Sequence, residues 1–189
     1  TGILSTWPES DYAARAQYHK ALCLEMLEDY ARASEEYVKM TYMYPESPLV
    51  GDATIRLATY YYTQEQKYDT AGRIYANFQK RFPTHERAAG ALFMGAQCRI
   101  KQAETLWGEK FGKGGVPPLV ADEYQAAIEA FTTLIDTYGG SSEQEQKLRA
   151  QAMYWAGDSS FKVGDFKNAY LFFKRTVFEY PETEWARRA

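Results

Sequence analysis

A repeat of about 38 residues constrains the fold of this chain more than any other feature. Four segments begin with an aromatic residue and carry alanine three positions later, namely Tyr30–Ala33, Tyr68–Ala71, Tyr124–Ala127 and Phe166–Ala169. A second aromatic residue follows seven positions after the first, at Tyr37, Tyr75, Phe131 and Phe173. A third follows after fourteen positions, just before proline or glycine, at Tyr44, Phe82, Tyr138 and Tyr180. Because these offsets share one helical face, each segment is predicted to be a helix that proline or glycine ends.

A second helix is predicted upstream of each aromatic segment. Nine positions before the leading aromatic lies a small residue, at Ala21, Thr59 and Gly157, with Gly95 as the counterpart in the third unit. Small side chains let two antiparallel helices approach closely, so each unit is predicted to be a helical hairpin. One hairpin cannot bury its apolar face alone, and neighbouring hairpins are expected to stack.

These positions resemble the tetratricopeptide repeat family. Its pattern is a small residue, an aromatic, alanine three later, a large residue four beyond that, and a closing proline. The resemblance implies an all-α, right-handed α-solenoid of stacked antiparallel helix pairs, with about four repeats and partial ones at both ends. Gly139 departs from the closing proline, and the usual tryptophan of the first helix is absent. The turns at 44–47 and 180–183 resemble the bacterial cell-envelope branch, which includes BamD-like outer-membrane assembly lipoproteins and the Tol-Pal coordinator.

The repeat register predicts one solenoid domain over residues 1–189. Its repeats cover about 11–47, 48–85, 86–140 and 143–183, and a partial repeat covers 184–189. Residues 7–10 match the tail of an earlier repeat. Solenoids normally end in a polar capping helix, and neither end of this sequence has one, so it is expected to be a piece of a longer array.

The third repeat carries an insertion at residues 105–120, rich in glycine and proline. One interpretation is a projecting loop that presents Trp107 and Phe111 to a partner, because insertions in repeat proteins map to loops on one face. The other is an extended first helix whose Trp107 packs on the next hairpin. Both interpretations remain open at this point.

Composition and motifs argue against several functions. A net charge of −3 offers no basic field for nucleic acid, and no apolar run approaches the length of a membrane span. The glycines around Lys113 lack the spacing and the hydroxyl residue of a phosphate-binding loop. The two histidines, His19 and His85, have no partner at metal-site spacing. No catalytic residue, metal or cofactor is therefore expected, and the protein is predicted not to be an enzyme.

Two further expectations concern single residues. The pair Glu35-Glu36 is predicted to be solvated charge on the outer face of a second helix. Cys23 and Cys98, which lie on first helices two repeats apart, are predicted to be small core residues that form no bridge with each other.

In the family that the sequence resembles, first helices line a concave groove. Counting from the repeat register places these candidate partner-binding residues in that groove: Arg15, Tyr18, Arg56, Tyr60, Arg99, Tyr154 and Asp158. Arginine and tyrosine dominate binding hot spots because they combine contact area with directional hydrogen bonds. Arg15, Arg56 and Arg99 form a basic line suited to acidic side chains or to the terminal carboxylate of a partner.

The resemblance favours a protein-binding scaffold, with a peptide or protein partner and a place in bacterial envelope assembly. It implies the periplasmic face of the outer membrane, with the cytoplasm as the other location. Two alternatives are a self-associating architectural array and a regulatory module of a larger protein. Scaffold folds host many functions, so the partner itself is not predicted.

Overall fold

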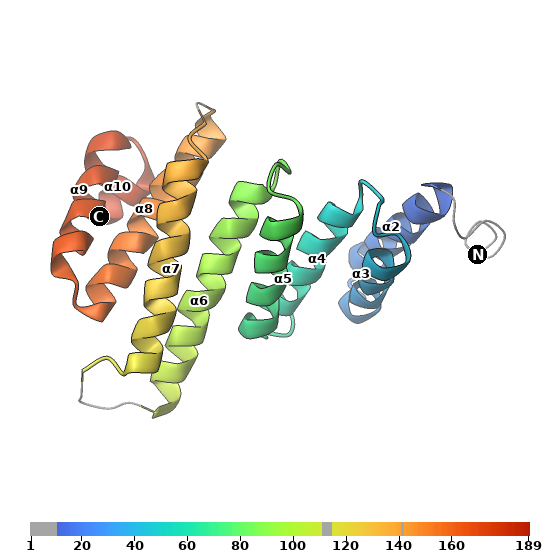
Figure 1. Ribbon diagram of the computed structural model, residues 1–189, viewed down its shortest axis with the longest axis horizontal. Coiled ribbons are helices and arrows are strands. Elements are labelled where there is room, and N and C mark those ends of the chain that lie inside the picture. Colours follow the sequence, from blue (N-terminus) through green and yellow to red (C-terminus); the bar gives the residue numbers. More distant parts are fainter. Residues whose placement is uncertain (1–10, 111–114, 141) are drawn as a thin grey trace. The chain divides into compact units, whose positions relative to one another are not determined.

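The structure is a computed structural model that describes residues 11–110, 115–140 and 142–189. Within these ranges the regular structure consists of helices, without a strand. The protein divides into two compact units between His85 and Glu86. The first unit contains α2 (Asp11–Met26), α3 (Tyr30–Met43), α4 (Val50–Thr63) and α5 (Tyr68–Arg81), as Figure 1 shows. The second contains α6 (Ala88–Lys110), α7 (Pro118–Thr137), α8 (Glu143–Val163), α9 (Phe166–Glu179) and α10 (Glu184–Arg188).

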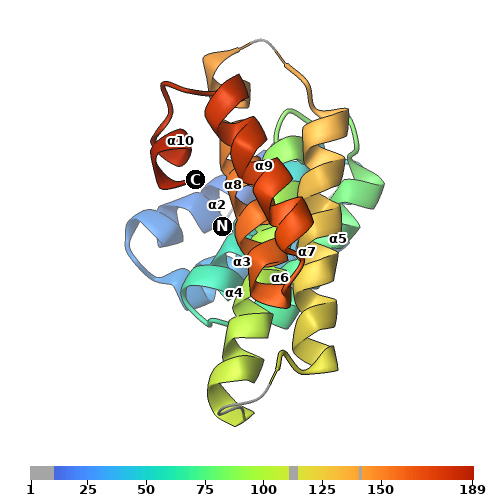
Figure 2. The ribbon, with the colours of Figure 1, turned by 90° about the vertical axis from the view of Figure 1, so that its left-hand side faces the viewer.

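Successive helices pair as hairpins within each unit. In the first unit α2 packs on α3 and α4 on α5, and α3 contacts α4. In the second unit α6 packs on α7 and α8 on α9, and α7 contacts α8. The short helix α10 lies against α8 and α9, which face the viewer in Figure 2. The predicted all-α class of stacked helix pairs is thus confirmed.

The aromatic and alanine positions of the repeat take the places predicted for them. The leading aromatics Tyr30, Tyr68 and Phe166 are the first residues of α3, α5 and α9. The alanines three positions later are buried in all four repeats, and so are the next aromatics in the first three, namely Tyr37, Tyr75 and Phe131. The third aromatic ends each helix. At Tyr44, for example, the backbone N–H donates to the Met40 carbonyl at 3.1 Å.

The turn inside the hairpin also repeats. Two positions before the leading aromatic, the backbone adopts a left-handed conformation, with φ of 59° at Glu28, 51° at Gln66 and 85° at Gly164. This conformation is energetically unfavourable for a residue with a Cβ atom, whereas glycine adopts it freely. The three turns are therefore structurally equivalent, although only one of them carries glycine.

The predicted close approach of paired helices is clearest at Gly157 of α8. A Cβ atom at this position would lie 2.8 Å from Cε1 of Phe173 and 3.2 Å from Cβ of Phe172, both in α9. Ala21 is fully buried in the first hairpin. Thr59 acts differently, because its hydroxyl lies 3.0 Å from the hydroxyl of Tyr75 and joins α4 to α5 by a hydrogen bond.

The insertion in the third repeat lengthens both helices of the hairpin. Helix α6 has 23 residues and α7 has 20, whereas α4 and α5 have 14 each. Pro117 occupies the N-cap of α7 and Pro118 its first position, where proline costs no hydrogen bond. Most of the described part of the insertion therefore continues the hairpin.

The expectation that Glu35 and Glu36 are both solvated is wrong for Glu36. Glu35 is exposed, but the side chain of Glu36 is only 7 % exposed, with Lys20 Nζ at 2.9 Å and Lys39 Nζ at 2.6 Å. Nε2 of Gln17 donates to the same carboxylate at 2.6 Å. Burial alone would raise the pKa of Glu36, but hydrogen bonds from Lys39, Lys20 and Gln17 outweigh it and lower that pKa. Gln17 and Lys20 belong to α2, so the Glu36 carboxylate joins α3 to α2.

The two cysteines differ from each other. Cys98 is buried as predicted, and burial raises the pKa of its thiol to about 12. Cys23 is exposed, so its assignment to the core was wrong. It lies two residues after the buried Ala21, and two residues on a helix of 3.6 residues per turn lead to the opposite side.

The close approach of α8 and α9 at Gly157 predicts that two glycine-to-alanine substitutions have opposite effects on stability. Gly157→Ala should lower the free energy of unfolding by about 1 kcal/mol or more, because the new methyl group collides with Phe173. Gly90→Ala in α6, where a Cβ atom meets nothing within 4 Å, should raise it by about 0.5 kcal/mol. Urea denaturation of both variants measures the difference. Equal effects would contradict close approach as the reason for glycine at 157.

The buried carboxylate predicts a pH effect. The pKa of Glu36 is lower in the folded state than the unfolded value of about 4.3. The stabilisation of the folded state by its carboxylate is therefore complete above about pH 4.3. The contribution is lost as pH falls through the folded pKa. Glu36→Gln should therefore cost about 1–2 kcal/mol near pH 7, and the cost should shrink below about pH 4. Denaturant melts between pH 3 and 7 measure this, with the exposed Glu35→Gln as a control expected to change stability by less than about 0.5 kcal/mol.

Candidate partner-binding surface

The candidate surface of the first unit begins where α2 meets α4. Tyr18 of α2 and Arg56 of α4 are one repeat apart in sequence, and Nε of Arg56 donates to the Tyr18 hydroxyl at 3.2 Å. Tyr18 is buried, with 8 % of its surface exposed. The register thus brings these two predicted residues together, and Tyr18 contributes its ring to the core beneath the surface.

Arg56 is held by further polar contacts. Its Nη1 lies 2.9 Å and 3.0 Å from the two carboxylate oxygens of Glu25, and the Tyr37 hydroxyl donates to the same carboxylate at 2.6 Å. Burial opposes the charged form of Arg56, but Tyr18, Tyr37 and Glu25 outweigh it and raise its pKa. Burial and the bond to Glu25 also raise the pKa of Tyr37. A partner carboxylate could engage Arg56 only by competing with Glu25.

The other two candidate residues of the first unit, Arg15 and Tyr60, differ in how accessible they are to a partner. Arg15 is exposed on α2. Tyr12 and His19, three before and four after it, are exposed on the same face. Tyr60 is half-buried, and its hydroxyl donates to Glu65 at 2.7 Å. Tyr60 is therefore folded back toward the turn that follows α4.

In the second unit Asp158 belongs to a charged cluster. Lys162, one turn later on α8, places its Nζ 3.0 Å from Asp158 and 3.6 Å from Glu104 of α6. The same Nζ lies 5.4 Å from the centroid of the Tyr124 ring. Burial opposes the charge on Lys162, but Asp158, Tyr124 and Glu104 outweigh it and raise its pKa. Arg99 is also paired, with Glu123 at 3.1 Å.

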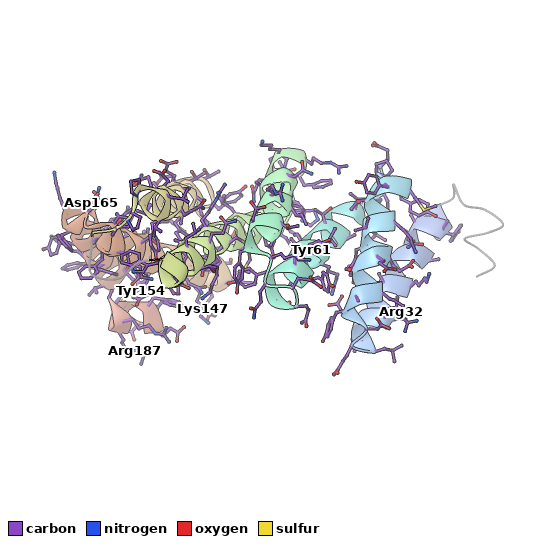
Figure 3. All side chains as sticks on the ribbon, turned by 90° about the horizontal axis from the view of Figure 1, so that it is seen from below. Arg32, Tyr61, Lys147, Tyr154, Asp165 and Arg187 are labelled. Carbon is purple, nitrogen blue, oxygen red and sulfur yellow. The ribbon has the colours of Figure 1, made fainter. Side chains whose placement is uncertain are left out.

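Tyr154 of α8, labelled in Figure 3, belongs to an aromatic group that includes α9 and α10. Its ring centroid lies 5.8 Å from that of Phe173 and 5.3 Å from that of Trp185. The guanidinium of Arg188 lies 5.0 Å from the Trp185 centroid, within cation–π range. Tyr154 and Trp185 are half-buried, so part of each side chain remains accessible.

Of the insertion candidates, Trp107 lies on α6, is half-buried and packs against the core of the second unit. This placement agrees with the second interpretation, an extended first helix. Phe111 lies outside the described residues.

Several residues of this surface were not singled out from the sequence, above all Glu25, Glu104, Lys162 and Trp185. Glu25 follows Tyr18 by seven positions and Lys162 follows Asp158 by four, so helical periodicity places each on the face of a residue that was chosen. The contacts of Glu104 and Trp185 join different helices and have no such local signal.

Two kinds of feature are absent from residues 11–110, 115–140 and 142–189. No group of three or more histidine, cysteine, aspartate or glutamate residues could hold a metal ion there. None of the helices in these ranges has the length and apolarity to cross a membrane.

The polar contacts of Arg56 predict a role in stability. Arg56→Ala should lower the free energy of unfolding by about 1–2 kcal/mol, because it removes charge-assisted hydrogen bonds and leaves Glu25 half-buried without them. Arg15→Ala should change it by less than about 0.5 kcal/mol. Urea denaturation of the two variants provides the comparison, and equal stabilities would show that the contacts of Arg56 contribute nothing measurable.

Comparison with known proteins agrees with the repeat pattern and the helix pairs. The model of a family described as YfiO, outer membrane lipoprotein, matches residues 13–151, which is well over half of the 189 residues. The matched stretch begins in α2 and ends within α8. No curated protein matches the sequence significantly. The chain therefore belongs to the YfiO family of outer membrane lipoproteins and is a tetratricopeptide-type protein of the bacterial cell envelope.

Proposed function

We propose that this protein is a non-catalytic scaffold that binds a protein or peptide partner through its first helices, at the periplasmic face of the outer membrane. The first helices are α2 and α4 in one unit and α6 and α8 in the other. Membership of a family of outer membrane lipoproteins supports the location. The partner-binding role rests on how side chains meet between neighbouring first helices.

The observation that carries this proposal is the contact between Tyr18 and Arg56. It joins two first helices through residues that the register had assigned to one surface. In the second unit, Glu104 and Lys162 likewise join α6 to α8. These contacts support a surface that runs across the adjacent first helices of each unit, along which the proposed partner segment would bind.

The chemistry of the proposed partner follows from which groups remain available. Arg56 and Arg99 already have carboxylate partners, which leaves Arg15 as the accessible cation of the predicted basic line. The exposed Tyr12 and the half-buried Tyr154 and Trp185 add aromatic surface. We therefore propose a partner segment that carries apolar or aromatic anchors and a carboxylate placed to meet Arg15.

The test is photo-crosslinking from single positions of the full-length protein in the cell envelope. A photoreactive amino acid replaces Arg15 on α2 or Arg99 on α6, and matched controls carry it at Lys80 on α5 or Asp136 on α7, which are exposed on second helices. We expect a discrete protein adduct from the first-helix positions and only background from the controls.

Two results would contradict the proposal. Equal adducts from first and second helices would remove any preference for this surface. An adduct that consists of two copies of this protein would favour the self-associating array in place of a scaffold for another protein. Mass spectrometry of the adduct separates these outcomes.

A further inference from the structure

The turn between α2 and α3 exposes two large apolar side chains that are neighbours in sequence. Met26 is 84 % exposed and Leu27 is 76 % exposed. Tyr30, the first residue of α3, follows with 36 % of its surface exposed. Exposed apolar side chains that are grouped, and not scattered singly, mark a site of interaction.

The second hairpin turn brings aromatic residues to the same edge of the first unit. Helices α2, α3 and α4 follow one another through short turns, so α2 and α4 run in the same direction and both hairpin turns lie at one edge. At the second turn the ring centroids of Tyr62 and Tyr68 lie 5.3 Å apart, and both residues are half-buried. Met26, Leu27, Tyr30, Tyr62 and Tyr68 are here called the turn edge.

The exposure of the first turn does not depend on where the sequence begins. Met26 and Leu27 lie four and three positions before the leading aromatic, and the second turn has Gln64 and Glu65 at these positions. Both are exposed, although a complete hairpin precedes them. An ordinary hairpin therefore leaves the next turn uncovered. The chain enters α2 at Asp11, which is about 22 Å from Met26 at about 1.5 Å per residue.

The hairpin itself does not require apolar residues at these two positions, because the second turn is polar there. The fourth hairpin differs in exposure. Its Lys162 lies 3.6 Å from Glu104 of the lengthened α6, and its Val163 packs against the core of the second unit. The pair of exposed apolar residues is thus a property of the first turn and not of the repeat.

Charged residues at the turn edge are paired within the protein. Nζ of Lys67 lies 2.8 Å from the carboxylate of Glu65, and Arg32 is paired with Asp29. Glu28 is exposed and adds negative charge. Attraction of an anionic surface needs clustered lysine or arginine residues, which this edge does not offer. Contact between the turn edge and its occupant must therefore be mainly apolar.

A lipid surface fits these properties. Apolar side chains on a protruding turn enter a lipid interface without needing a complementary cavity. Tyrosine is favoured at the boundary between headgroups and hydrocarbon, because its ring is apolar and its hydroxyl polar. The chain belongs to a family of outer membrane lipoproteins, so a membrane lies within its reach. Attachment to that membrane gives even a weak apolar contact a high effective concentration.

We propose that the turn edge contacts the lipid surface of the outer membrane, with Met26 and Leu27 inserted below the headgroups and the three tyrosines at headgroup level. This proposal rests on the outer-membrane location in the proposed function. It does not rest on partner binding, which concerns other residues. Lipid contact at the turn edge would determine which edge of the first unit faces the membrane.

The test is fluorescence quenching by lipids that carry a spin label on the acyl chain. The full-length lipoprotein is reconstituted in vesicles of phosphatidylethanolamine and phosphatidylcholine, with Cys23→Ser to remove the exposed thiol, whereas Cys98 is buried. A fluorophore is attached at Ala31→Cys, exposed in the first turn of α3, or at Ala76→Cys, exposed in the middle of α5. We expect quenching and a blue shift of emission from Ala31→Cys and neither from Ala76→Cys.

A double variant gives the first turn the residues of the second. Met26→Gln, Leu27→Glu introduces the pair found at Gln64 and Glu65, so circular dichroism should show unchanged helicity. Quenching from Ala31→Cys should be lost, because both apolar anchors are removed. Tyr42→Ser changes another exposed aromatic residue of α3, outside the turn edge, and should leave the quenching unchanged.

Salt distinguishes apolar from electrostatic contact. Raising its concentration from about 0.1 M to about 0.5 M should leave the quenching unchanged, because apolar contact is not screened. Loss of quenching in high salt, equal quenching from the two labelled positions, or quenching that survives the double variant would overturn the proposal. So would a discrete protein adduct from a photoreactive residue at Leu27 in the cell envelope, since it would identify a protein occupant, a second copy included. Crosslinking from Arg15 is measured separately, so the two proposals can fail independently.

Discussion

Both units depend on one packing interaction. A buried alanine and an aromatic ring on the second helix of each hairpin pack against small residues on the first helix. The alanine three positions into each second-helix pattern is at most 2 % exposed in every repeat. Alanine allows the helices to approach, and the aromatic residue four positions later fills the space between them. Burial of one large apolar side chain contributes about 1.5–3 kcal/mol, so repetition of this pair supplies much of the driving force for stacking.

This packing places some long charged side chains between helices, where they form ion pairs. Glu36 lies beside the buried Tyr37, and its charge is balanced by Lys20 and Lys39. Arg56, between two hairpins, is balanced by Glu25. Buried charges without partners are costly, so removal of one member of such a pair is expected to destabilise the interface between its helices. Two arginines of the predicted basic line, Arg56 and Arg99, are thus paired with carboxylates of the protein itself, which is why the proposed function assigns recognition to Arg15 and the exposed aromatic residues.

Sequence periodicity predicted the helices closely, but it predicted the contacts of the candidate surface only in part. The starts of α3, α5 and α9 coincide with the leading aromatics, and in α3 and α9 the preceding aspartate caps the helix. Arg99 and Asp158 lie on first helices as the register required, but their partners Glu123 and Lys162 did not emerge from it. The predicted burial of Glu36 and Cys23 was wrong. The repeat register assigns residues to a helical face, but it does not show how far a flexible side chain reaches or where the buried face ends.

The sequence by itself determined that the protein forms repeated helical hairpins, which positions of each hairpin are buried, and that it resembles envelope tetratricopeptide proteins. These properties follow from local spacing, since side chains three, four and seven residues apart share a helical face. Only the tertiary structure decided which charges are paired and that the insertion lengthens α6 and α7. Those features depend on contacts of a few ångströms between atoms of different helices, and sequence spacing carries no direct measure of such distances.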